Sequence, residues 1–158
     1  MHPILILDNI RSTHNVGSIF RTADAAGVGM IYLVGTTPTP VDKFGRKRKD
    51  IAKASLGAEE TISWKYEKTI VPVISKLKKA GYAVVSLEQS PKSIDYKKAG
   101  KLLKGKPIAI ILGNEVEGVS QKALIKSDYI VEIPMKGIKE SLNVSVATGI
   151  ALFRLLGI

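Results

Sequence analysis

The chain has 158 residues, 45% of them hydrophobic, with 24 Lys and Arg against 14 Asp and Glu, so its formal net charge is +10. This length and composition predict one domain with its own core over residues 1–158, and the charge favours a polyanionic partner. The absence of cysteine excludes disulfides, thiolate metal sites and cysteine nucleophiles, and with only His2 and His14 we expect no metal site.

The chain starts with an apolar run, "ILILD" (residues 4–8), that predicts a β-strand. The flanking residues lack the basic region and cleavage site of a signal peptide, and no run of about 18 apolar residues occurs anywhere. We therefore expect a cytoplasmic protein without a membrane partner.

A helix is predicted in "HNVGSIFRTADAAGVG", residues 14–29, with Asn15 as its N-cap. Arg21 lies off the apolar stripe, one turn after Gly17, whose missing side chain leaves room for a close approach. The ordinary alternative for Arg21 is a surface ion pair with Asp24, three residues further on. The stripe comprises Val16, Ile19, Phe20 and Ala23.

After a second apolar run, "MIYLVG" (residues 30–35), comes an irregular stretch to about residue 50 that contains the basic run "KFGRKRKDIAK", Lys43 to Lys53. We predict that this basic run contacts the polyanion. The alternative is that its lysines only solvate the surface, which is the explanation we favour for "KLKKAG" and "KKAGKLLKGK". The predicted contact residues are Lys43, Arg46, Lys47, Arg48, Lys49 and Lys53.

The middle of the chain alternates helical and strand patterns. "TIVPVISKLKKAG" (69–81) and "SQKALIKSD" (120–128) predict helices, and residues 89–106 have no clear pattern. Because several strand runs are unbroken rather than alternating, we expect an α/β fold with a mainly parallel sheet and helices on both faces. The strands predicted here are "YAVVSL" (82–87), "IAIILG" (108–113) and "YIVEIP" (129–134).

The loop after residues 108–113, "GNEVEGVS", has the glycine spacing of a P-loop without its chemistry. Val119 and Ser120 stand where a P-loop needs Lys and Ser or Thr, and Glu115 and Glu117 would repel phosphate. No G-x-G-x-x-G follows the first strand either, which disfavours an ordinary dinucleotide fold. The loop is expected to hold another kind of ligand, or to be a simple turn in which Glu115 caps the following helix.

The segment "EIPMKGIKESLNVSVATG" repeats the order strand, glycine-containing loop, polar residues and helix. Taken singly, Ser141 is a loop hydroxyl and Asn143 an N-cap. Together with Asn15, Arg21 and Glu115, they are expected to converge at the carboxyl edge of the sheet, where parallel folds place ligands.

The last segment, "NVSVATGIALFRLLGI", is apolar on nearly every side, and Arg154 is its only charge. A helix that rests on its own sheet keeps a polar face, so we predict that this one packs against another subunit in a homodimer. The alternative is a helix buried wholly within one chain.

These residues carry a resemblance. "NVGSIFRTADAAGV", "ILGNEVEGVS" and "IPMKGIKESLNVSVATGIALF" resemble the three ordered motifs of the SpoU, or TrmH, family of RNA 2′-O-methyltransferases in the SPOUT superfamily. The most specific parts are N-x-G-x-x-x-R, from Asn15 to Arg21, and S-L-N, from Ser141 to Asn143. Residues from about 60 to 105 contribute little. We expect residues 1–158 to be a single methyltransferase domain without the additional RNA-binding domain or extensions that many members carry.

The resemblance implies a trefoil-knotted α/β domain that transfers a methyl group from S-adenosylmethionine to a ribose 2′-hydroxyl of tRNA or rRNA. It also implies a homodimer with the last helix in the interface. The cofactor would be held in the knot, largely by backbone groups, around Leu87, Gly113, Ile133, Met135 and Leu142.

By the same resemblance, Arg21 orients the ribose and its phosphate. A base role is disfavoured, because a guanidinium with a pKa above about 12 resists deprotonation. Asn15 would orient Arg21 or the ribose, Glu115 and Asn143 would fix the loops, and Ser141 would act at the cofactor or substrate. The competing hypotheses are an inactive SPOUT-like RNA-binding protein and a flavodoxin-like nucleotide-binding enzyme, which no phosphate-binding motif supports.

Overall fold

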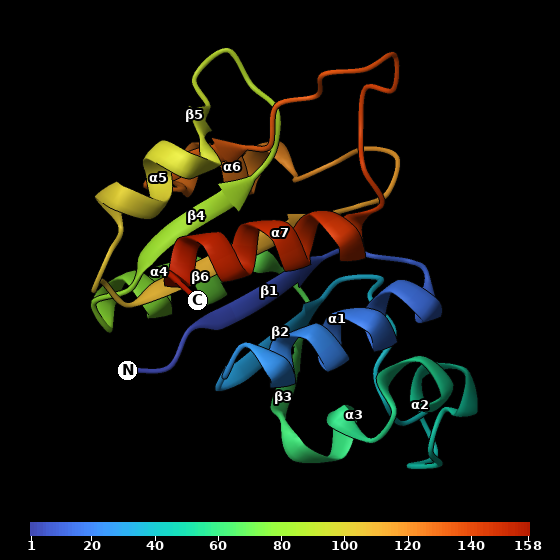
Figure 1. Ribbon diagram of the computed structural model, residues 1–158. Helices are drawn as coiled ribbons and strands as arrows, with labels where there is room; N and C mark the ends of the chain where they lie inside the picture. Colours follow the sequence, from blue (N-terminus) through green and yellow to red (C-terminus); the bar gives the residue numbers. More distant parts are fainter.

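Seven parallel strands form one sheet in the computed structural model, which describes residues 1–158 (Figure 1). Their order across the sheet is β3-β2-β1-β6-β4-β7-β5, so β6 lies between β1 and β4. The strands are β1 (Ile4–Asp8), β2 (Met30–Val34), β3 (Ser63–Glu67), β4 (Ala83–Leu87), β5 (Ile94–Asp95), β6 (Ile108–Gly113) and β7 (Tyr129–Glu132).

Helices cover both faces of this sheet, as the alternating sequence pattern predicts. Helices α1, α5 and α7 pack on one face, with α7 between the other two, while α4 and α6 cover the opposite face (Figure 1). The two short helices that directly follow β2, α2 and α3, pack on the outer side of α1. The helices are α1 (Thr13–Ala25), α2 (Lys49–Ser55), α3 (Ala58–Thr61), α4 (Ile70–Lys79), α5 (Tyr96–Leu102), α6 (Gln121–Lys126) and α7 (Val144–Leu156). None of them combines the length and apolar character that a membrane crossing requires.

The five predicted strands are confirmed, and the two that sequence patterns missed lie at the sheet edges. The central strands β1 and β6 are buried along their whole length, which explains their unbroken apolar runs. By contrast, β3 is largely exposed and reads "SWKYE". The expectation of an irregular stretch over 89–106 was wrong, because β5 and α5 lie there. Helix α5 buries only Ala99, so its lysines hide the helical period.

Two expectations about α1 need correction. Its N-cap is Ser12, whose hydroxyl accepts a hydrogen bond from the Asn15 backbone N–H at 3.1 Å, so the Asn15 side chain is free for other contacts. The room beside Gly17 is filled by helix α2 and not by a ligand. A Cβ at residue 17 would lie 2.6 Å from the Ile51 carbonyl oxygen and 2.7 Å from the Ala54 Cβ. Gly17 therefore permits two helices to touch.

Candidate active site

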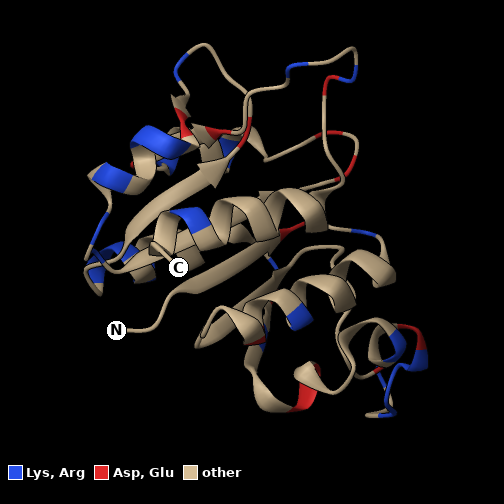
Figure 2. Ribbon diagram, in the orientation of Figure 1, with Lys and Arg blue, Asp and Glu red and all other residues tan.

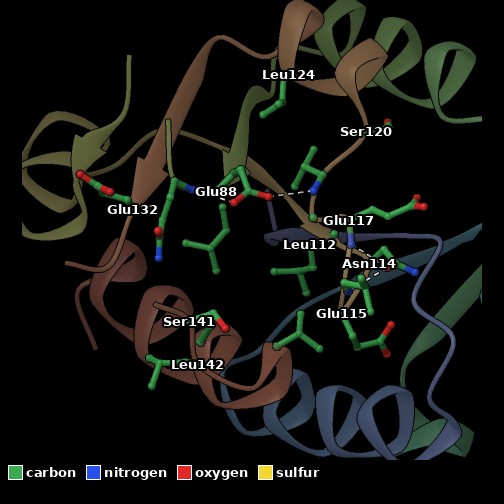
Figure 3. Close-up of a pocket in the computed structure, with 18 of the residues that line it drawn as sticks. Glu88, Leu112, Asn114, Glu115, Glu117, Ser120, Leu124, Glu132, Ser141 and Leu142 are labelled. Carbon is green, nitrogen blue, oxygen red and sulfur yellow. Dashed lines mark hydrogen bonds between the residues drawn. The ribbon is translucent and has the colours of Figure 1, made fainter. Parts of the chain in front are cut away.

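A cavity of about 1050 Å³ opens at the carboxyl edge of the sheet, where the loops after β4, β6 and β7 meet the start of α7. In Figure 3, Glu115 lies on one side of it and Ser141 and Leu142 on the other. Eight of the predicted site residues line it: Leu87, Gly113, Glu115, Ile133, Met135, Ser141, Leu142 and Asn143. Residues from two of the three motif segments thus surround one space.

A chain of side-chain hydrogen bonds joins the remaining motif segment, which starts at Asn15, to these two. The Asn15 side chain, which is 6% exposed, donates from Nδ2 to Oε1 of Glu115 at 3.2 Å. Its Oδ1 accepts from Nδ2 of Asn143 at 3.1 Å. Asn143 is also the N-cap of α7, because its Oδ1 accepts from the backbone N–H of Ser145 at 2.9 Å. Asn15 therefore links the start of α1 to the loops that form the cavity.

Glu115 caps a helix, though not the one that follows it in the sequence. Its carboxylate accepts hydrogen bonds from the backbone N–H groups of Arg11 and Ser12, at 3.1 and 3.0 Å, just before α1. Desolvation opposes ionisation of this carboxyl, but the bonds from Ser12 and Arg11 outweigh it and hold the pKa of Glu115 below its usual value. A negative charge at this helix start is also favoured by the helix dipole.

Replacing Glu115 by Gln should lower the free energy of unfolding by about 1 kcal/mol at neutral pH, because the cap loses its charge. Since the folded-state pKa of Glu115 lies below the usual 4.5, this stabilisation is present above that pH and is lost as the pH falls through the folded value. Thermal melts should therefore show a Tm gap between wild type and Glu115→Gln that closes in acid. Glu117→Gln is the matched control on the same exposed loop, and an equal loss in that variant would contradict the capping role.

The loop after β6 forms a rigid wall of the cavity. The N–H of Asn114 donates to the Gly118 carbonyl at 3.0 Å, and the N–H of Gly118 donates to the Asn114 carbonyl at 2.9 Å. Because the loop folds back so tightly, a Cβ at residue 113 would overlap the amide nitrogen of Val119. Gly113 is therefore required by this fold of the loop.

Three carboxylates in this region were missed by the sequence analysis: Glu88, Asp8 and Glu132, the last residue of β7, which also lines the cavity. Glu88 follows β4, lines the cavity and accepts a hydrogen bond from the Val119 N–H at 2.9 Å (Figure 3). Asp8 ends β1, is buried, and accepts from the Ser120 N–H at 3.0 Å. The available signal was the place of each acid, at or directly after the carboxyl end of a predicted strand.

Arg21 does not line the cavity. It follows Asn15 by six residues, about 9 Å along the helix, and lies exposed beside a smaller hollow formed with the α2–α3 connection. The ion pair with Asp24 considered as an alternative does not form, and the Asp24 carboxylate instead accepts from Oγ1 of Thr61 at 3.0 Å. Arg21 takes part in none of the structure's salt bridges.

Half of the cations predicted to contact a polyanion are paired within the chain. Arg46 pairs with Asp42 at 2.8 Å, and Arg48 with Asp50 at 3.2 Å. Lys47 lies 2.6 Å from the Glu60 carboxylate, and hydrogen bonding to Glu60 raises the pKa of Lys47. The cations of the basic run without an ion pair are Lys43, Lys49 and Lys53.

A second group of unpaired lysines lies on α5, far from the basic run in the sheet order (Figure 2). Lys97, Lys98 and Lys101 are exposed and form no salt bridge. Formal charge in the sequence did not distinguish these lysines from those of the basic run, because ion pairing depends on the tertiary fold.

Helix α7 buries one face in the chain and leaves apolar side chains on the other. Leu152 and Leu155 belong to the core, whereas Val146 is 51% exposed and Ile150 is 38% exposed. Leu142, just before the helix, is 40% exposed. These three residues form an apolar strip. A surface helix that packs only within its own chain has polar side chains at such positions.

Comparisons with known proteins agree on one family. A model of the SpoU rRNA methylase family matches residues 2–153. The tRNA (guanosine(18)-2′-O)-methyltransferase of Escherichia coli is 31% identical over 93% of this chain and 59% of its own length. The chain spans between 56% and 59% of the length of the curated relatives that it matches.

Solved structures show the same likeness. The AdoMet-bound rRNA methyltransferase of Sinorhizobium meliloti superposes with a TM-score of 0.86 at 32% identity, over 98% of this chain and 57% of that one. The TrmH/SpoU tRNA modifying enzyme of A. aeolicus gives a TM-score of 0.82 at 30% identity, over 96% of this chain and 72% of that one.

Proposed function

This chain belongs to the SpoU rRNA methylase family, and from that premise we propose that it transfers a methyl group from S-adenosylmethionine to a ribose 2′-hydroxyl of tRNA or rRNA in the cytoplasm. The observation that carries the proposal is the chain of hydrogen bonds from Glu115 through Asn15 to Asn143, which joins all three motif segments at one cavity. A shared ligand site would explain why Asn15, near the start of the chain, is bonded to residues 100 and 128 positions further on.

The residues around the cavity suit this cofactor. It carries a sulfonium and an ammonium group, and four glutamates, Glu88, Glu115, Glu117 and Glu132, line the cavity of a chain that is otherwise strongly basic. Leu87, Ile133 and Leu142 offer apolar surface for an adenine ring. The cofactor supplies, when bound, an electrophilic methyl group.

The protein's own residues then have to bind and orient the RNA. Arg21 presents a planar guanidinium outside the cavity, where it would contact a ribose oxygen and a phosphate of the strand rather than the cofactor. Asn15 and Asn143 would keep the loops in position, and the Ser141 hydroxyl would bond to cofactor or substrate. The unpaired cations Lys43, Lys49 and Lys53 would bind phosphates further along the strand.

The proposal includes a homodimer and a trefoil knot. The apolar strip of Leu142, Val146 and Ile150 supports a second copy packed against α7, because contact with a partner removes this surface from water. The knot is supported by the strand order, in which β6 enters between β1 and β4. Because the site residue Asn143 caps the start of α7, a partner packed on α7 would lie beside the site.

Calorimetry of the purified protein tests the cofactor. S-adenosylmethionine or its demethylated product should bind at least about tenfold more tightly than NAD or ATP, since the cavity lacks a phosphate-binding loop and is lined by carboxylates. A protein that binds RNA without binding the methyl donor would be an inactive relative instead. Tight binding of NAD would contradict the proposed function.

A further inference from the structure

A small hairpin, residues 40–48, projects between β2 and α2, and its backbone is held by its own hydrogen bonds. Val41 pairs with Lys47 across it, and the N–H of Asp42 donates to the Arg46 carbonyl at 2.8 Å. At its base the N–H of Arg48 donates to the Pro40 carbonyl at 2.9 Å. The turn closes at Gly45, whose φ of +76° favours glycine.

The Asp42 carboxylate organises the tip of the 40–48 hairpin. It accepts hydrogen bonds at 2.9 Å from the backbone N–H groups of both Phe44 and Arg46, and at 2.8 Å from Nε of Arg46. These bonds leave the tip with a defined shape even though Lys43, Phe44 and Gly45 are exposed. The hairpin is thus organised before any partner binds.

The tip displays an exposed aromatic ring with two cations close to it. Phe44 is 70% exposed and belongs to neither hydrophobic core cluster. Lys43 Nζ lies 5.1 Å from the centre of its ring, and Arg46 Cζ lies 5.0 Å from it. An apolar protein pocket that received this ring would have to bury both cations with it, which is costly. A polynucleotide instead offers a flat base for the ring and phosphates for the cations.

We propose that Phe44 is a stacking platform for an unpaired base of the RNA, with Lys43 on a neighbouring phosphate; the inference rests on the proposed RNA substrate. A base inside a double helix has both faces covered by its neighbours, so the platform selects single-stranded loops, bulges or ends. The hairpin follows β2, whose carboxyl end lies at the same edge of the sheet as the cavity, and in Figure 1 it lies beside α2, across α1 from the loops of the cavity. Because α2 lies against α1 at Gly17, the platform is anchored beside the helix that carries Arg21.

The test uses a stem-loop RNA with 2-aminopurine, a fluorescent base quenched by stacking, in the loop, and a fully paired duplex of the same length. Wild type should quench the loop probe, and Phe44→Leu, which keeps the bulk but loses the ring, should abolish the quenching and weaken stem-loop binding about five- to tenfold. Phe44→Trp should restore both. Duplex affinity should not change in either variant. Equal stem-loop affinity of Phe44→Leu and wild type, or an equal loss on the duplex, would overturn the proposal.

Salt dependence separates the ring from the cations. Lys43→Ala should lower the slope of log affinity against log salt for the stem-loop by about 0.7 to 0.9, because one phosphate contact is lost, while Phe44→Leu keeps the slope. Lys97→Ala, on α5, is the control with the same charge change, and its slope should match wild type. If Lys97→Ala lowered the slope as much as Lys43→Ala did, Lys43 would contact the RNA no more specifically than any other surface lysine, which would contradict the proposal. These RNA-binding measurements need no cofactor. Their failure can therefore be distinguished from a failure of the proposed function, which calorimetry with the methyl donor tests.

Discussion

Arg21→Lys should lower the rate of methyl transfer at least about a hundredfold, which is the usual contribution of a positioned catalytic group. Lysine keeps the positive charge but lacks the planar guanidinium group, which can donate hydrogen bonds to a ribose oxygen and a phosphate at the same time. The fold should be unaffected, because Arg21 is exposed and takes part in no salt bridge. Cofactor affinity should also stay near wild type, since Arg21 does not line the cavity.

Single-turnover transfer of a labelled methyl group to RNA measures this effect, with thermal melts and calorimetry on the same samples. Asp24→Asn is the matched control, because Asp24 lies beside Arg21 in the same hollow and hydrogen-bonds to Thr61. That variant should transfer methyl at nearly the wild-type rate. Near-normal transfer by a well-folded Arg21→Lys protein would remove Arg21 from the active site.

The second large effect is expected at Gly113, where an alanine should lower cofactor affinity more than about tenfold and the Tm by roughly 4 to 10 °C. Its Cβ would overlap the amide of Val119 and the carbonyl group of Gly118, so the loop after β6 would have to move. That loop is a wall of the cavity and also carries Glu115. One methyl group therefore disturbs both the wall and the cap on α1.

Gly137→Ala is the matched control for this change. Gly137 lies in the loop after β7, and a Cβ there would meet no atom within 4 Å. Calorimetry with S-adenosylmethionine and thermal melts should show wild-type behaviour for Gly137→Ala and a double loss for Gly113→Ala. If Gly113→Ala bound the cofactor normally, the loop after β6 would be adaptable, which would contradict its role as a rigid wall of the cavity.

The central strands and the meeting of motif segments at one sheet edge were predictable, because both depend on local patterns. Continuous apolar runs mark β1 and β6, and the carboxyl ends of parallel strands share an edge by geometry. The strands β3 and β5 were not predictable, since an edge strand with an exposed face carries little hydrophobic signal.

The finer contacts of the site lay beyond sequence patterns because they join distant residues. Asn15 precedes an apolar stripe and is of a residue type favoured at N-caps. The N-cap is nevertheless Ser12, and the Asn15 side chain bonds to Glu115 and Asn143. Likewise Lys47 counts as a free cation in the sequence until Glu60, thirteen residues on, is brought to it. The long-range geometry that decides such pairings is absent from propensity and spacing.

The strand order has a consequence for how the chain folds during synthesis. β1 pairs with β2 across one helix, but its other neighbour is β6, and Ile4 lies opposite Ala109 in that pair. The position beside β1 in the sheet therefore stays unoccupied until more than a hundred residues have been synthesised. Such long-range parallel pairing is slow, so we expect folding to be limited by the entry of β6. A nascent chain that ends before Asn143 still lacks the hydrogen bond between Asn15 and Asn143, so the proposed site is complete only after the start of α7 has been made.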